Sequence, residues 1–216
     1  MRQFNSIAIE QQGVTLVELL IALCIFALIV IGFSSIDTFS RYHVVSSDKR
    51  AKLQNDASYV LGHMAKEIGK AIGNESINGA GSVITITDNP NDDSIQIYID
   101  ASGNGKREEP KNNPLATEDH WIAYRYDATA GDQNQIRYCA RCRNDSCNFN
   151  QCLDSVEILS RKIASFTPTF SSANNYVDIQ INACWDADGS PAACGGLDNP
   201  ALVMKNRIYM PAVSTH

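Results

Sequence analysis

The hydrophobic pattern of the chain begins with a continuous apolar run. From residue 14 to residue 33, Glu18 is the single strongly polar side chain, and the mildly polar Thr15 lies close to it. About 20 apolar residues span a bilayer as a helix. A carboxylate inside such a run costs roughly 2.5–3.5 kcal/mol on insertion scales, so its position is functional by default. The pattern therefore predicts a membrane helix with one acidic residue that needs a partner.

The same helix is predicted to continue beyond the membrane. No proline occurs before Pro90, and a polar stretch over 37–54 leads into apolar residues spaced by three and four positions. Such spacing is typical of one face of a helix. Gly73 and Asn74 form the predicted C-terminal stop. We expect this half of the helix to pack its apolar stripe against a folded domain. The stripe consists of Leu53, Ala57, Val60, Leu61, Met64, Ile68 and Ile72.

From residue 77 onward the pattern changes to short segments that are typical of strands. The segment 156–170 is ambiguous, because its first part has helical spacing and its second part alternates. One long helix followed by several short antiparallel strands predicts an α+β fold, with the sheet around the second half of the helix. The strands are predicted at 83–87, 94–99, 121–126, 135–140, 176–184 and 207–210, with a turn at 88–92.

The residues at the start of the apolar run resemble a known processing signal. Gly13-Val14-Thr15-Leu16-Val17-Glu18 follows a polar segment, whereas the cleavage site of a secretory signal follows its apolar core. The motif is similar to the class III signal of type IV pilins and type II secretion pseudopilins. This resemblance implies cleavage after Gly13 by a prepilin peptidase and methylation of the new amino terminus at Val14. Two departures are Val14, where the family usually has Phe, and a leader with one basic residue, Arg2.

The resemblance also implies a role for Glu18 and a pilin fold. In that family the corresponding acid pairs with the amino terminus of a neighbouring subunit and draws it into the filament in register. After cleavage, Val14 carries an α-amino group that methylation keeps cationic. Charge pairing offsets part of the desolvation cost of a buried carboxylate. Our hypothesis is therefore that Glu18 is an assembly residue and not a catalytic one.

These patterns divide the chain into four parts. We expect a leader at 1–13, a transmembrane half of the helix at 14–35, a periplasmic amphipathic half at 36–75 and a β-rich, disulfide-stapled domain at 76–216. The expected location is a single pass through the inner membrane with a periplasmic domain, and then the pilus or pseudopilus of a Gram-negative bacterium.

The length and the early part of the mature chain resemble PilW-type minor pilins. That resemblance implies that the chain helps to prime or cap filament assembly. It also implies other minor pilins, the major pilin and the inner-membrane assembly platform as partners. A J-type minor pseudopilin of type II secretion is the alternative within the family. A tip adhesin or calcium-dependent binding module, using the 101–118 loop and the cysteine region, is the alternative from another class.

Seven cysteines add a constraint on the exported part. Cys24 lies in the membrane run and is expected to pack as a small apolar residue. An even number of cysteines in an exported region predicts disulfides, and the sequence does not choose their pairing. Cys184 with Cys194 is the favoured pair, because it closes a short loop. Zinc is the rival interpretation of the dense cluster. The six exported cysteines are Cys139, Cys142, Cys147, Cys152, Cys184 and Cys194.

The net charge and the absence of known motifs argue against two further functions, nucleic-acid binding and catalysis. The 216 residues carry a net charge of −6 without a basic stripe, which argues against nucleic acid as a partner. No nucleophile elbow, phosphate-binding loop or metalloprotease helix occurs, and we predict that the chain is not an enzyme. No cofactor is predicted apart from calcium, because oxygen ligands alternate at the start of the 100–111 loop. The candidate calcium ligands are Asp100, Ser102, Asn104 and Glu108, although Lys111 stands where an EF-hand loop has Glu.

Overall fold

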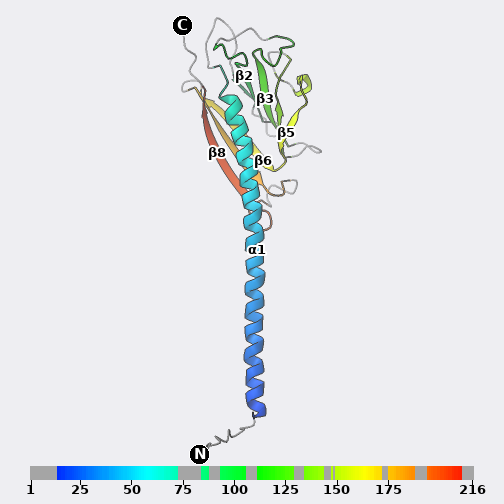
Figure 1. The fold of residues 1–216 in the computed structure, drawn as a ribbon, viewed down its shortest axis with the longest axis vertical. Coiled ribbons are helices and arrows are strands. Elements are labelled where there is room, and N and C mark those ends of the chain that lie inside the picture. The colour runs from blue at the N-terminus through cyan, green and yellow to red at the C-terminus, as the bar shows by residue number, and fades with distance from the viewer. Residues whose placement is uncertain are drawn as a thin grey trace, which may run out of the picture. The chain divides into compact units, whose positions relative to one another are not determined.

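The structure is a computed structural model that describes residues 14–72, 84–87, 93–105, 111–128, 134–143, 147, 149–171, 175–187 and 194–210. It contains one long helix, α1 (Leu16–Ile68), followed by strands (Figure 1). The chain divides into two compact units, of which the first ends at Val44 and the second begins at Val45. This is an α+β arrangement consistent with the pilin fold, as the sequence predicts.

The second unit contains two antiparallel sheets. The five-stranded sheet has the order β1-β2-β3-β4-β5, and the three-stranded sheet has the order β6-β7-β8. The strands of the first sheet are β1 (Ile84–Thr87), β2 (Ser94–Ile99), β3 (His120–Asp127), β4 (Gln135–Cys139) and β5 (Glu157–Ser160). Those of the second sheet are β6 (Ile163–Ser171), β7 (Tyr176–Cys184) and β8 (Ala201–Tyr209). A short 3-10 helix covers Phe149–Gln151.

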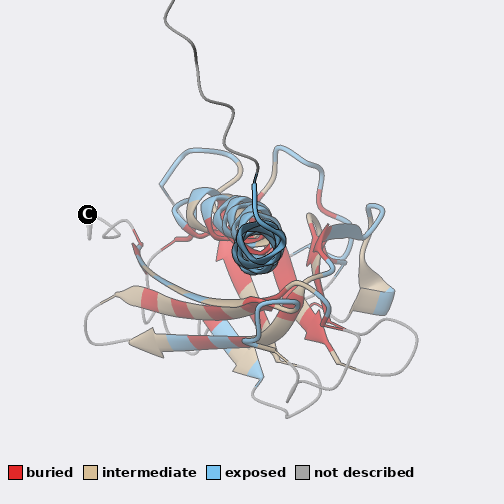
Figure 2. Ribbon diagram, turned by 90° about the horizontal axis from the view of Figure 1, so that it is seen from below, coloured by how far each residue is buried: buried red, intermediate tan, exposed pale blue. Residues whose placement is uncertain are grey.

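The core of this unit lies between α1 and the strands. The apolar stripe predicted on the helix is buried, and one cluster joins it to apolar residues of both sheets. Figure 2 shows the buried residues gathered on the strands that face the helix. The helix is amphipathic here because its other side meets water. Stripe residues with no exposed surface are Leu53, Ala57, Val60, Met64 and Ile68.

The helix ends earlier than its pattern predicts. α1 stops at Ile68, and the Gly73 stop lies outside the described residues. Glycine lowers helix propensity, and Gly69 follows the last helical residue. Beyond it, the Ala71 backbone forms an isolated bridge with Ile99 and the Ile72 N–H donates to Tyr98 O. The chain therefore leaves the helix to join the end of β2, a long-range pairing that periodicity does not reveal.

The ambiguous segment 156–170 forms strands in the structure. It contributes β5 and most of β6, which meet at a tight connection over 161–162. Pro168 lies in β6, opposite Ile179 of β7. β6 is an edge strand of its sheet, and proline is tolerated there because one side of an edge strand needs no N–H donor. Pairing with neighbouring strands thus overrides the helical spacing at the start of the segment 156–170.

Side-chain hydrogen bonds hold the two sheets and the helix together. The Tyr126 hydroxyl donates to Ala164 O at 2.8 Å, with Asn134 Oδ1 at 3.1 Å as a second acceptor. Asn134 adopts a positive φ of 62°, a conformation that asparagine tolerates, and its amide donates to Ala187 O. On the helix side, the Ser160 hydroxyl donates to the Asp56 carboxylate at 2.5 Å.

Buried tyrosines predict how stability depends on alkaline pH. Burial is the main cause that raises the pKa of Tyr124 and of Tyr138 above the ordinary value. The neighbouring Tyr138 adds to the rise at Tyr124, and the negative charges of Glu67 and Glu157 add to it at both tyrosines. The unfolded chain ionises its tyrosines near pH 10, whereas the folded chain keeps these two protonated. The unfolded state then binds fewer protons, so the free energy of unfolding falls as pH rises above about 10.

We expect Tyr124→Phe to flatten this alkaline fall in the free energy of unfolding. Denaturant unfolding of the detergent-solubilised chain at a series of alkaline pH values measures the slope. Tyr59→Phe is the matched control, because Tyr59 lies on α1 and is 53% exposed. An equal slope in wild type and Tyr124→Phe would contradict the assignment.

Candidate functional site

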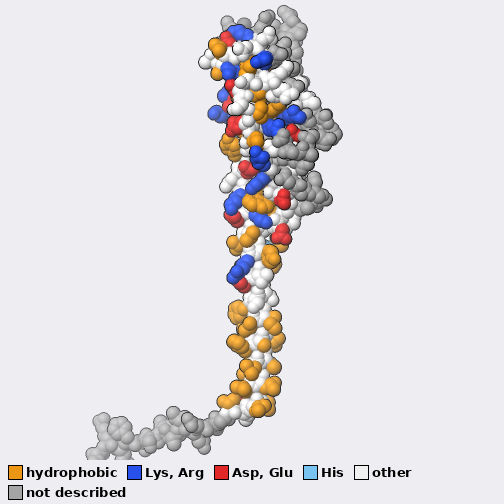
Figure 3. Space-filling view, turned by 90° about the vertical axis from the view of Figure 1, so that its right-hand side faces the viewer, with side chains coloured by type: hydrophobic (Ala, Val, Ile, Leu, Met, Phe, Trp, Pro, Cys, Tyr) orange, Lys and Arg blue, Asp and Glu red, His pale blue; other side chains and the backbone are white. Residues whose placement is uncertain are grey.

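The candidate site is the N-terminal part of α1, in the first unit. Every residue from Val14 to Val44 is exposed in the single chain, including all the large apolar side chains of the run. On the face seen in Figure 3, hydrophobic side chains cover this part of the helix. Among the described residues, α1 is the one helix long and apolar enough to cross a membrane. So large an exposed apolar surface requires lipid or other helices around it.

Thr15 and Glu18 form a capping box at the start of α1. The Thr15 N–H donates to Glu18 Oε2 at 2.9 Å, and the Thr15 hydroxyl donates to the same oxygen at 3.0 Å. In return, the Glu18 N–H donates to Thr15 Oγ1 at 3.3 Å. This reciprocal arrangement satisfies two of the N–H groups that a helix start leaves without partners. Glu18 therefore has a local structural role in addition to any role between subunits.

The capping box leaves part of the Glu18 carboxylate available. Both donors from Thr15 contact Oε2, and among the described residues Oε1 accepts no hydrogen bond. An ionised carboxylate accepts about four hydrogen bonds. The helix N-terminus also places partial positive charge beside it. The hydrogen bonds from Thr15 therefore fix the orientation of the carboxylate and leave Oε1 able to accept a hydrogen bond from a cationic donor.

The sequence analysis did not predict the helix-capping role of Glu18, although the sequence contains the signal for it. Thr15-x-x-Glu18 before an apolar run is the signature of a capping box. Val14 lies directly before the box and is exposed, so the predicted new amino terminus adjoins the helix start. Gly13 and the leader at 1–13 lie outside the described residues.

Three hydroxyl side chains follow the apolar run and satisfy themselves within the helix. Ser34 Oγ donates to Val30 O, Ser35 Oγ to Ile31 O, and Thr38 Oγ1 to Ser34 O, all between 2.9 and 3.0 Å. Such bonds to the carbonyl four residues earlier let polar side chains lie in a non-aqueous setting. The first ion pair after the run, Arg41 with Asp37 at 2.9 Å, marks the return to an aqueous environment.

The six cysteines that follow Cys24 form three disulfides in the structure. Cys139 is bonded to Cys152, Cys142 to Cys147, and Cys184 to Cys194. The last is the pair favoured by its short loop. Cys24 is free and exposed on the apolar helix. The first two bonds fasten the 139–152 region to the end of β4.

The predicted calcium ligands are brought together in part. Asp100 Oδ1 accepts hydrogen bonds from the Ser102 hydroxyl and from the N–H groups of Gly103 and Asn104. Asp100 Oδ2 accepts a hydrogen bond from the Gly105 N–H at 2.7 Å. Glu108 lies outside the described residues. The Asp100 carboxylate therefore holds the backbone of residues 102–105 in a compact turn.

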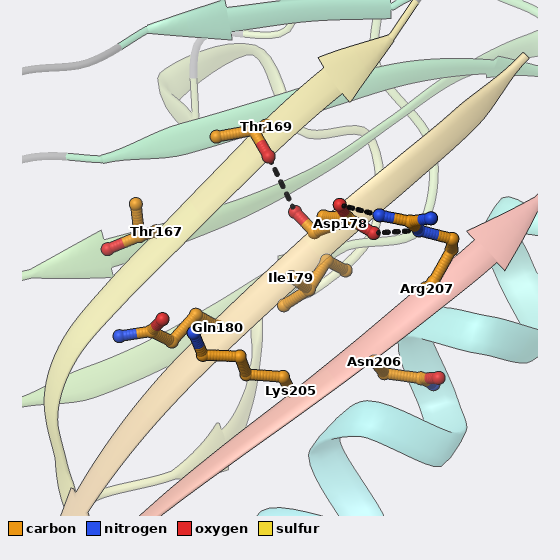
Figure 4. A pocket seen from close by; sticks show the side chains of 8 residues that line it. All are labelled: Thr167, Thr169, Asp178, Ile179, Gln180, Lys205, Asn206 and Arg207. Atoms are coloured by element: carbon orange, nitrogen blue, oxygen red, sulfur yellow. Dashed lines mark hydrogen bonds and ion pairs between the residues drawn. The ribbon is translucent and has the colours of Figure 1, made fainter. Parts of the chain in front are cut away.

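A shallow depression of about 400 Å³ lies on the outer face of the three-stranded sheet. Figure 4 shows how a row of side chains crosses it from β6 to β8. The Arg207 guanidinium donates two hydrogen bonds to the Asp178 carboxylate at 2.7 and 2.8 Å and lowers the pKa of that carboxyl. Arg207 also lies 4.1 Å above the ring of Tyr176. Asp178 and Arg207 thus pair with each other, while Lys205 also lines the depression, and the face offers a polar surface rather than a reactive group.

The two histidines that the structure describes in the second unit, His63 and His120, make contacts within the fold. His63 Nδ1 lies 3.0 Å from the Tyr124 hydroxyl, and its ring packs against Tyr138. His120 is buried, with its two ring nitrogens 2.6 Å from Glu118 O and 3.1 Å from Ala140 O. Each ring is therefore held by neighbouring groups of the fold.

Comparison with known proteins supports the importance of the N-terminal site. Residues 10–34 match a family model described as the prokaryotic N-terminal methylation motif. No curated protein and no solved structure matches the chain. The match covers the predicted cleavage site, the capping box and most of the apolar run. The motif implies processing by a prepilin peptidase and association with a membrane.

Proposed function

We propose that this chain, whose N-terminal motif supports a place among type IV pilin-like proteins, is a minor pilin that helps to prime or cap a type IV pilus. The observation that carries the proposal is the methylation motif at 10–34 on an exposed apolar helix. Within this run, Glu18 is the one ionisable carboxylate, held at the helix start with Oε1 available. Such a carboxylate suits capture of the cationic amino terminus of the next subunit.

A role in assembly explains why the Glu18 carboxylate lies in an apolar segment, where a membrane makes a charge costly. A buried ion pair offsets desolvation when its geometry and hydrogen bonds are good. The two hydrogen bonds from Thr15 orient the carboxylate before a partner arrives, which reduces the entropy lost on pairing. In this proposal the partners are other minor pilins, the major pilin and the inner-membrane assembly platform. The protein then performs no catalysis, and its second unit is carried into the filament.

Deletion of the gene in its own host tests the proposal. We expect few or no surface filaments, restored by a plasmid copy, while type II secretion of a marker enzyme continues. Loss of secretion with filaments retained would replace the pilus assignment with the J-type pseudopilin. Normal filaments and normal secretion would contradict both.

A calcium-dependent binding surface at residues 100–111 is the second candidate. The specific observation is that, within the described part of this loop, Asp100 Oδ2 accepts one hydrogen bond, from Gly105, which leaves lone-pair capacity for a cation. In this candidate, calcium raises the melting temperature of the chelator-treated protein, and Asp100→Asn removes that rise. Asp198→Asn is the control, because Asp198 lies outside this loop. An unchanged melting temperature of the wild-type protein rules calcium out.

A further inference from the structure

Three cysteine sulfurs lie close together in the second unit, and a fourth is bonded to one of them. We call Cys139, Cys142, Cys147 and Cys152 the four-cysteine cluster. Cys139 Sγ and Cys142 Sγ belong to different disulfides and lie 3.6 Å apart. The Sγ atoms of Cys139, Cys142 and Cys147 all lie within 4.8 Å of one another. Cys152 Sγ is bonded to Cys139 Sγ and so lies beside this group of three.

Backbone hydrogen bonds bring these cysteines together independently of their disulfides. The Leu153 N–H donates to Arg141 O at 2.8 Å and the Arg143 N–H donates to Gln151 O at 3.1 Å, which sets Cys142 opposite Cys152 as an antiparallel bridge. The Cys142 N–H also donates to Trp121 O of β3. Cys139 is the last residue of β4.

Cys147 is held from another strand. Its N–H donates to Gln96 Oε1 of β2 at 2.9 Å. Cys139 and Cys142 are therefore attached to the sheet through the main chain, Cys147 through the Gln96 side chain, and Cys152 through its pairing with Cys142. None of these contacts uses a sulfur–sulfur bond, so we expect the thiols to stay close together after reduction.

The surroundings of the cluster suit a bound soft cation. Cys139, Cys142 and Cys147 are at most 3% exposed and pack with Tyr98 and Trp121. An apolar shell excludes water and strengthens metal–ligand bonds. Arg141 and Arg143 flank Cys142 in sequence, and the Arg141 guanidinium is paired with the Asp154 carboxylate at 2.8 Å.

We propose that the four-cysteine cluster in its thiol state binds one Zn²⁺ through all four sulfurs. Tetrahedral zinc with Zn–S bonds of about 2.3 Å places its sulfurs roughly 3.8 Å apart. The 3.6 Å between Cys139 Sγ and Cys142 Sγ already approaches that spacing. Binding releases the thiol protons, and the resulting site carries two negative charges. Because the disulfides use the same sulfurs, metal and disulfides are alternative states, and a chain that has not yet been oxidised takes the metal.

Cobalt binding to the reduced chain tests this site. A phosphine reductant converts each disulfide into two thiols, supplying two electrons while water supplies two protons and oxygen, and the phosphine becomes its oxide. After anaerobic removal of the reductant, the full chain in detergent receives Co²⁺. We expect the visible absorption bands of tetrahedral cobalt thiolate at one ion per chain, and their loss when Zn²⁺ is added. The oxidised chain is expected to show none.

Matched variants assign the ligands. Cys142→Ser is expected to weaken the cobalt bands and to lower zinc affinity at least tenfold, in the range seen when metal-site groups are lost. A double variant, Cys184→Ser with Cys194→Ser, removes the distant disulfide and is expected to bind cobalt as the wild type does. Equal binding by Cys142→Ser would overturn the proposal.

The folded state of the reduced chain is followed by near-ultraviolet circular dichroism. If the reduced chain unfolds and Zn²⁺ restores its spectrum, metal binding is coupled to folding, which supports the site. If the reduced chain stays folded without cobalt bands, or unfolds and is not restored by Zn²⁺, the cluster is a disulfide cluster only.

Discussion

Glu18→Ala is expected to abolish incorporation of this chain into filaments while leaving its cleavage intact. Removing the carboxylate makes the apolar helix easier to insert, by roughly 2.5–3.5 kcal/mol on insertion scales, so membrane anchoring is retained. The substitution also removes the capping box, which costs about 1 kcal/mol of helix stability. The substitution also removes the negative charge with which the amino terminus of a neighbouring subunit would pair. Immunoblotting of sheared filaments measures incorporation, and the mass of the membrane-extracted chain measures cleavage.

Two further variants separate charge from capping. Glu18→Gln keeps a side chain that serves at this position of a capping box but carries no charge. Thr15→Ala removes the capping hydroxyl and keeps the charge. We expect Glu18→Gln to fail in assembly as Glu18→Ala does, and Thr15→Ala to assemble at a reduced level. If Glu18→Gln assembles normally and Thr15→Ala fails, the carboxylate acts through helix capping and the assembly hypothesis is wrong.

Gly13→Leu is expected to leave the leader on the chain and to keep it out of filaments. The motif implies a peptidase that cuts after this residue, and a branched side chain there obstructs the approach of the scissile bond to the enzyme. The uncut chain has no amino terminus at Val14, so the cationic partner for the next subunit is missing. Intact mass spectrometry is expected to find residues 1–13 retained in the variant, and a methylated Val14 terminus in the wild-type chain.

A change on the other side of the scissile bond provides the control. Val14→Phe introduces the residue that is usual at this position in the resembling family, and we expect normal cleavage and assembly. A wild-type chain that keeps residues 1–13 beside an active prepilin peptidase would remove the basis of the proposed function. Cleavage of Gly13→Leu at the wild-type rate would place the processing site elsewhere.

Much of the fold follows from short-range pattern. The apolar stripe on α1 is buried where its spacing predicts, because helix periodicity alone decides which side chains share a face. Strands with strict alternation, such as β2 and β7, lie close to their predicted positions. β8 extends over Ala201–Tyr209, whereas the pattern indicates only its last residues. Val203 and Tyr209 on its outward side are large hydrophobic residues that stay exposed. The sequence of β8 therefore does not alternate clearly between apolar and polar residues.

By itself, the sequence determined the membrane helix, the acid within it and the motif around Gly13, because each depends on residues within a few positions of one another. The capping box of Thr15 and Glu18 is equally local and was readable from its spacing. Only the tertiary structure decided the end of α1 at Ile68, the division of the strands into two sheets and the close approach of the Cys139, Cys142 and Cys147 sulfurs. These features depend on which distant backbones form hydrogen bonds, and pairing energies between distant segments leave no periodic trace in a single chain.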